Sequence, residues 1–146
     1  MTYARIFITL TLILLAFAAT ELSLAKGKNV ITKDQLIEMF DNLPKKPDWD
    51  STKPLLWGYF FTDQSKEKLE TVAPLLAKQG YRVVDIFLSE KDNPKEPDIW
   101  WLHVEKVEIH NPETLNQRNM IFYQFADDNG IDSYDGMDVG PAPTNH

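Results

Sequence analysis

The stretch from residue 99 to residue 110 constrains the fold of this chain more than any other part of the sequence. It reads Ile-Trp-Trp-Leu-His-Val-Glu-Lys-Val-Glu-Ile-His and contains neither glycine nor proline. Its β-branched and aromatic residues suit a pleated, half-buried surface, so we predict a long strand in the middle of a sheet. The apolar alternation loses its phase after Val104, and we expect a β-bulge near Glu105 and Lys106 to absorb the slip.

The composition indicates one globular domain with an acidic surface. The chain has 146 residues, of which 43% are hydrophobic, and this is enough for one real core. Its net charge of -7 argues against binding to phosphate backbones and makes a basic partner more plausible. The same charge is also explained by solubility alone. The absence of cysteine excludes disulfides, thiolate zinc sites and thiol nucleophiles.

The first 25 residues have the features of a secretory signal peptide. Residues 1–5 supply a short positive region, and residues 6–19 form an uncharged apolar run that is short for a membrane span. Small residues permit cleavage after Ala18 or after Ala25. We therefore expect an exported, periplasmic protein with no stable membrane span after cleavage. If the segment is not a signal, the chain is expected in the cytoplasm.

The remaining chain divides into a short N-terminal region and one domain. Residues 26–53 combine a helix capped by Thr32 with a proline-containing linker. Residues 54–141 form the domain, and residues 142–146 form a disordered tail. Within the domain, Gly80 and Gly130 are expected to end two helices, while Asn111 begins the second. The predicted order is strand 55–62, a helix that is capped by Asp63 or Ser65 and ends at Gly80, strand 81–89, strand 99–110, helix 112–129 and strand 131–139.

This order of elements predicts an α+β, ferredoxin-like fold. Right-handed strand–helix–strand crossovers place both helices on one face of a four-stranded antiparallel sheet. The first and third strands are then central, and these are the two aromatic-rich strands. The N-terminal helix is an addition to this βαββαβ unit, and it either packs on the domain or forms a loosely held arm.

Four segments resemble the regulator of ribonuclease activity B family: residues 59–63, 78–83, 100–104 and 133–140. The Tyr134-Asp135-Gly136 element is the most specific of them, although the family typically continues with tryptophan where this chain has Met137. The family comprises small ferredoxin-like proteins described as inhibitors of ribonuclease E. The resemblance therefore implies a non-catalytic regulatory domain that binds a protein. Because of the signal peptide, we expect an exported member with an altered partner.

The helix-free face of the sheet is the first candidate site for a partner. If Leu56, Gly58 and Phe60 point to the helices, the other face carries a set of large aromatic side chains and a histidine: Trp57, Tyr59, Phe61, Trp101 and His103. An isolated soluble domain rarely exposes so much apolar area. Either a partner binds this face, or the N-terminal helix or a second copy covers it.

The C-terminal strand offers a second, acidic candidate surface for a basic partner: Asp132, Tyr134, Asp135 and Asp138. A calcium loop is a weaker interpretation, because the EF-hand register places Phe125 where the first acid should be. A structural role is also open for Tyr134-Asp135-Gly136. In that role Asp135 accepts backbone hydrogen bonds at a strand end, and Gly136 permits a close approach.

No motif in the sequence predicts catalysis, a metal site or a cofactor. The chain has no Gly-x-Ser-x-Gly, phosphate loop or His-Glu-x-x-His. His103 and Glu105 have the spacing of two metal ligands, but a solvent-facing or hydrogen-bonded pair is the simpler expectation because no third ligand is identifiable. RNA recognition would need a basic–Gly–aromatic signature that the strand lacks. The alternative to a binding domain is a small-ligand or enzymatic domain that uses the face of Trp101 and His103, and an enclosed cavity beside His103 would favour it.

Overall fold

The computed structural model describes residues 30–144 of the chain. The predicted signal peptide at residues 1–25 lies outside the described residues. Within residues 30–144, no helix is both long and apolar enough to cross a membrane.

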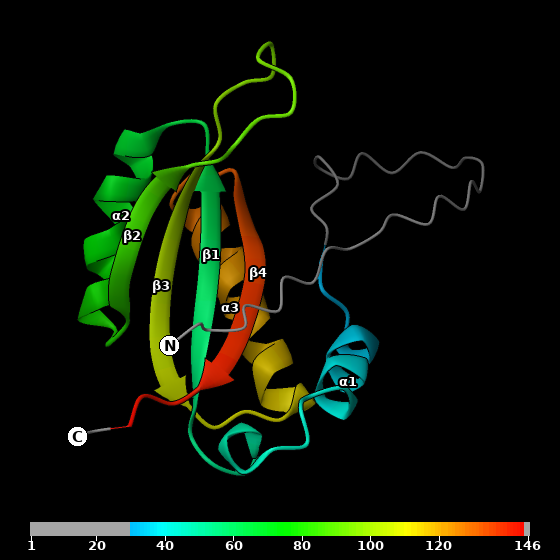
Figure 1. The fold of residues 1–146 in the computed structure, drawn as a ribbon. Helices are drawn as coiled ribbons and strands as arrows, with labels where there is room; N and C mark the ends of the chain where they lie inside the picture. The colour runs from blue at the N-terminus through cyan, green and yellow to red at the C-terminus, as the bar shows by residue number, and fades with distance from the viewer. Residues whose placement is uncertain (1–29, 145–146) are drawn as a thin grey trace, which may run out of the picture.

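The described residues form a four-stranded antiparallel sheet with the order β2-β3-β1-β4. Figure 1 shows α2 and α3 behind this sheet, while α1 lies beside α3 near the β4 edge. The predicted ferredoxin-like arrangement is confirmed. The elements in chain order are α1 (Lys33–Asp41), the 3-10 turn η1 (Pro47–Trp49), β1 (Leu55–Asp63), α2 (Lys66–Lys78), β2 (Arg82–Leu88), β3 (Trp100–Glu108), α3 (Pro112–Asp128) and β4 (Ser133–Pro141).

The two central strands pair without interruption along their whole length, from Leu55 opposite Glu108 to Asp63 opposite Trp100. The predicted bulge near Glu105 and Lys106 is therefore wrong. The apolar pattern slips there only because Val107 is 47% exposed and Ile109 is 57% exposed, so neither residue has to face the core.

The register shifts occur in the outer strands. In β2 an extra residue, Val84, lies between the two positions that pair with Val104 and His103. In β4 the extra residue is Asp135, next to Gly136, whose φ is 114°. Both shifts fit the rule that bulges concentrate at sheet edges.

Local sequence signals define the ends of the helices as expected. Thr32, Ser65 and Asn111 each accept a backbone N–H of the first helical turn. Gly80 and Gly130 follow the ends of α2 and α3 with φ values of 88° and 64°, in the left-handed region that favours glycine.

The core lies between the sheet and the two helices behind it. Trp57, Tyr59 and Phe61 of β1 are fully buried and point towards this core. The Phe122 ring of α3 lies 4.9 Å from that of Tyr59 and 5.2 Å from that of Phe61, both in edge-on contact. The assignment of these β1 residues to the helix-free face is therefore wrong. Both faces of β1 are apolar, so alternation alone did not decide which face is buried.

The N-terminal region packs on the domain. Leu36 of α1 is fully buried, and Lys33 forms an ion pair with Glu113 of α3. The backbone N–H of Ile31 donates to the Tyr123 hydroxyl at 2.9 Å. In the segment expected to be only a linker, the Trp49 side chain joins the core.

A polar network joins the end of β3 to α3 at one end of the core. Arg118 donates to both carboxylate oxygens of Glu108, with N–O distances of 2.8 and 2.9 Å. The Tyr59 hydroxyl donates to the same carboxylate at 3.0 Å, and His110 Nε2 lies 3.3 Å from it. Burial alone would raise the pKa of Glu108, but the hydrogen bonds from His110 and Arg118, the Arg118 charge and the Tyr59 hydrogen bond lower it to about 2.

We predict that Glu108→Gln removes a stabilisation that depends on pH. Because folding lowers the pKa of Glu108 from 4.5 to about 2, the ionised carboxylate stabilises the fold fully above pH 4.5. This stabilisation is lost as the pH falls from 4.5 towards 2. Urea denaturation should show the variant to be less stable than the natural chain by about 2 kcal/mol at neutral pH, with the gap closing in acid. Glu90→Gln, in the exposed loop between β2 and β3, is the control. A difference in unfolding free energy between Glu108→Gln and the natural chain that stays the same at low pH would contradict the account.

A second buried polar pair lies inside the core. The Tyr134 hydroxyl donates to Asn119 Oδ1 at 2.7 Å, and both side chains are buried. Asn119 Nδ2 has no hydrogen-bond partner among the described residues. The pair therefore fixes the relative position of α3 and β4.

We expect Tyr134→Phe alone to lower the free energy of unfolding by about 1–3 kcal/mol, because it leaves the Asn119 carbonyl oxygen without a donor. The double variant Tyr134→Phe with Asn119→Leu removes both polar groups and should recover much of that loss. Urea midpoints of the two single variants and the double variant measure the coupling. Strictly additive losses would show that the two side chains do not act as a pair.

Candidate protein-binding face

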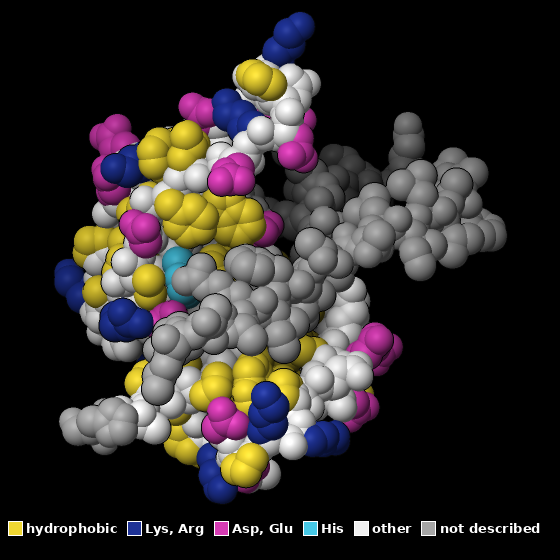
Figure 2. Space-filling model, in the orientation of Figure 1, with side chains coloured by type: hydrophobic (Ala, Val, Ile, Leu, Met, Phe, Trp, Pro, Cys, Tyr) yellow, Lys and Arg dark blue, Asp and Glu magenta, His cyan; other side chains and the backbone are white. Residues whose placement is uncertain are grey.

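The face of the sheet turned away from α2 and α3 carries both aromatic and acidic side chains. Directly opposed residues of antiparallel strands project to the same face, so the strand register defines rows across the sheet. Three rows matter here: Phe87, Trp101 and Thr62; then Asp85, His103 and Phe60; then Arg82, Glu105, Gly58 and Asp138. Figure 2 shows hydrophobic side chains gathered over this face of the molecule.

The structure separates the aromatic residues that the sequence analysis had grouped together. Trp101 and His103 lie on the helix-free face as predicted, but Trp57, Tyr59 and Phe61 lie on the opposite face, in the core. Their place on the helix-free face is taken by Phe60, which pairs directly with His103. Contact between the predicted residues and a partner stays a prediction. The aromatic side chains that this face does carry include Trp101, His103 and Phe60.

Four aromatic side chains from the first two of these rows form a continuous band across three strands of this face, called the aromatic row below. They are Phe87 of β2, Trp101 and His103 of β3, and Phe60 of β1. The Phe87 and Trp101 rings are nearly parallel with centroids 6.3 Å apart, and Phe60 meets Trp101 edge-on at 6.0 Å. Phe60 also stacks on His103 at 4.5 Å. Phe87 remains 39% exposed at the outer end of the row. These contacts fix the side chains in place, so they form a rigid apolar surface.

Acidic side chains lie beside the aromatic row. Glu105 and Asp138 pair with Gly58 from its two sides, and Asp85 lies opposite His103. Glu105 forms an ion pair with Arg82, and its Oε1 lies 3.4 Å from His103 Nε2. The two side chains are thus neighbours on one strand face, as their spacing predicted. In residues 30–144, no group of three or more His, Asp or Glu side chains is placed to hold a metal ion.

The remaining acidic candidates do not form one surface with Asp138. Asp132 lies at the start of β4, where its N–H donates to Asp63 and its carboxylate accepts the N–H of Gln64 at 3.2 Å. It joins the ends of β1 and β4. Tyr134 is buried, and Asp135 is the exposed bulge residue in β4. The Tyr134-Asp135-Gly136 element is therefore a bulge within the strand, whereas a strand-end device was expected.

Both edges of the sheet are modified against the addition of a further strand. In β2, Val84 interrupts the ladder, and the Asp85 carboxylate accepts the N–H of Ile86 at 2.7 Å. In β4 the bulge at Asp135 interrupts the ladder, and a Cβ on Gly136 would lie only 3.1 Å from Ile31. Bulges and charged side chains are common means of protecting an edge. The helix-free face is therefore a better candidate site than either edge.

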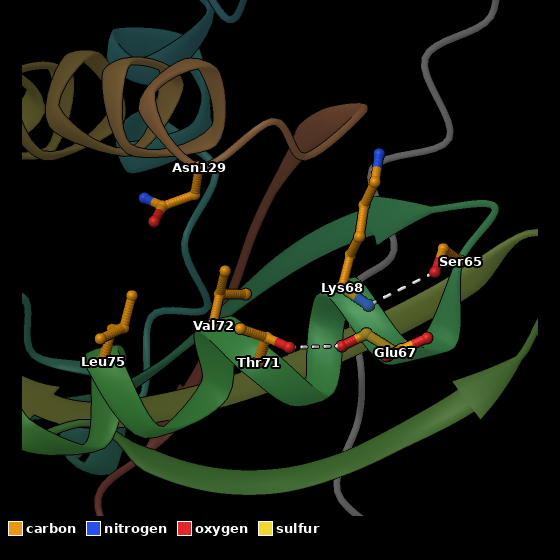
Figure 3. Close-up of a pocket in the computed structure, with 7 residues that line it drawn as sticks. All are labelled: Ser65, Glu67, Lys68, Thr71, Val72, Leu75 and Asn129. Atoms are coloured by element: carbon orange, nitrogen blue, oxygen red, sulfur yellow. Dashed lines mark hydrogen bonds between the residues drawn. The ribbon is translucent and has the colours of Figure 1, made fainter.

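Two hollows in the described part of the chain lie elsewhere and are open to solvent. One, of about 240 Å³, separates the first turns of α2 from Asn129 at the end of α3 (Figure 3). Its wall includes Lys68, whose backbone N–H donates to the Ser65 cap, and Leu75. The other lies between the end of β1, the first turn of α2 and the residue before β4, and it is lined by five polar residues: Asp63, Gln64, Ser65, Lys68 and Asp132. Neither hollow is lined by His103, so they give no support to an enclosed site there.

Several face residues were missed by the sequence analysis. Phe60 was assigned to the wrong face, and Phe87 and Asp85 were not considered, because β2 resembles an ordinary half-buried strand. One available signal was the size of the β1 side chains. Trp57, Tyr59 and Phe61 together bury more area than the alternate set, which includes Gly58.

We predict that Gly58→Ala perturbs this face specifically. A Cβ at this position would overlap Asp138 Oδ1 and lie 2.8 Å from His103 Nε2, so both side chains would have to move. The loss of stability should be about 1–3 kcal/mol, and Asp138→Ala should relieve part of it. Gly140→Ala is the matched control on the same face, because nothing lies within 4 Å of its Cβ position. Thermal unfolding measures both variants, and equal effects at the two glycines would contradict the proposed crowding.

A comparison with protein-family models identifies one match, described as regulator of ribonuclease activity B, over residues 33–139. The matched segment begins at the first residue of α1 and ends within β4, so it includes the N-terminal helix as well as the sheet. A search among curated proteins finds no match.

Proposed function

The chain belongs to the regulator of ribonuclease activity B family, and we propose that it is an exported regulatory domain that binds a protein partner through its helix-free face. Membership in a family of regulators supports a regulatory, protein-binding role. The features of residues 1–25 support export. Inhibition of ribonuclease E, which the family resemblance implies, would require a cytoplasmic chain, so we propose an altered partner for the exported one.

The observation that carries this proposal is the aromatic row on the sheet face. Phe87 is 39% exposed at the outer end of this row, and ring contacts continue the row inwards through Trp101 to Phe60. Aromatic side chains held in fixed positions are typical anchors of protein interfaces, because little conformational entropy is lost when a partner covers them. The edges of the sheet are modified against strand addition, which favours this face over the edges as the surface for recognition.

A pull-down from the exported fraction tests the proposal. The natural chain should retain a protein partner, and Phe87→Ser should reduce that retention about tenfold through loss of an apolar anchor. Ile121→Ser is the matched control, because Ile121 is 58% exposed on α3, away from the face. Loss of the partner with the control but not with Phe87→Ser would contradict the choice of face. Copurification of a small molecule or metal without any protein would contradict the binding function itself.

Export has its own test. Mass spectrometry of the chain recovered from fractionated cells should find a mature N-terminus at residue 19 or residue 26 in the periplasmic fraction. An intact Met1 in the cytoplasmic fraction would refute export and make ribonuclease E a possible direct target.

A further inference from the structure

We propose that the helix-free face recognises a basic protein segment, with apolar side chains on the aromatic row and arginine or lysine side chains beside Glu105, Asp138 and Asp85. This inference rests on the proposed protein-binding function and adds the chemistry of the partner. It is argued from the charge, spacing and exposure of the side chains on one face.

The charge of the face is unbalanced. Among residues 30–144, three carboxylates, those of Asp85, Glu105 and Asp138, share the face with a single guanidinium, that of Arg82. Arg82 pairs with Glu105, and Asp85 is exposed at the β2 edge. The chain as a whole carries a net charge of -7, so the long-range field also attracts a cationic partner.

The spacing of the rows adds a geometric requirement. Along β3, Trp101 and Glu105 are separated by four residues, which is about 13 Å in a strand. A partner must therefore present an apolar group and a cationic group about 13 Å apart, as an extended segment does with side chains four residues apart. Glu105 and Asp138 lie in one row, called the acidic row here. Beyond it, Val107 and Leu56 lie opposite each other and continue the apolar surface, and Val107 is 47% exposed. Apolar surface thus lies on both sides of the acidic row.

A second copy of the chain is a poorer occupant of this face. In a two-fold dimer built face to face, each copy would bring the same three carboxylates and one guanidinium to the interface. Two chains of charge -7 also repel each other. A basic segment removes this repulsion and can place cationic side chains over the exposed parts of the aromatic rings as well.

The test is an NMR titration of the full chain with two terminally blocked ten-residue peptides. Both contain the same leucine and serine residues, and they differ only in having arginine or glutamate at three positions. The arginine peptide should shift the backbone amide signals of β1, β2 and β3 around Phe60, Phe87 and Glu105, and the glutamate peptide should not. Added salt should weaken the binding, because exposed charges are screened.

Two charge variants decide whether the acidic side chains are responsible. Asp85→Asn and Asp138→Asn should each weaken binding of the arginine peptide about three- to tenfold. Asp34→Asn on α1 changes the net charge equally but lies outside the face, so it should have little effect. Equal binding of both peptides, shifts confined to α2 and α3, or equal effects of all three variants would overturn the inference.

These experiments distinguish failure of the proposed protein-binding function from failure of the inference that the partner is basic. If Phe87→Ser abolishes partner retention while Asp85→Asn and Asp138→Asn do not change peptide or partner binding, the face binds a protein but not through its carboxylates. If light scattering shows a dimer that Phe87→Ser disrupts, the occupant is a second copy and the basic-segment inference is wrong.

Discussion

The antiparallel register between β1 and β3 is the constraint on which the rest of the structure depends. It places Tyr59 opposite Val104 on one face and Phe60 opposite His103 on the other. The first pair belongs to the core under α3, and the second belongs to the helix-free face. Because side chains alternate along a strand, a slip of one residue would exchange the two sets and move the polar His103 from the helix-free face into the core under the helices. The same pairing therefore determines the core and the candidate binding face.

The two sides of the sheet have different physical roles. Behind the sheet, Tyr59, Phe61 and Phe122 pack edge-on, and the Glu108–Arg118 network fixes the end of β3 against α3. In front, aromatic and charged groups sit on strands that are held from behind. The front side chains are thus positioned by a rigid scaffold, which limits the entropy that binding has to remove. This arrangement suits a domain that recognises a protein surface.

The order of the elements, the helix caps and the centrality of the two aromatic strands could all be predicted from the sequence, because each has a local signal. The glycines at positions 80 and 130 and the caps at Thr32 and Asn111 are examples. The buried face of β1 could not be read from alternation, because large apolar residues occupy both faces. The expected bulge in β3 was wrong because Val107 lies exposed on the helix-free face. The actual bulges lie in the outer strands, and no sequence signal in those strands predicted them. The recognition role of Phe87 and Asp85 depends on cross-strand neighbours, which become visible only when the register of β2 against β3 is known.

The most direct test of the central claim is hydroxyl-radical footprinting of the protein with and without its partner, read residue by residue by mass spectrometry. If the helix-free face binds, oxidation of Trp101, Phe87 and Val107 falls in the complex, while Met120 and Ile121 on the outer side of α3 react at the same rate as in the free protein. Protection of Met120 and Ile121 with unchanged oxidation of Trp101 and Phe87 would place the interface on the helices and contradict the account.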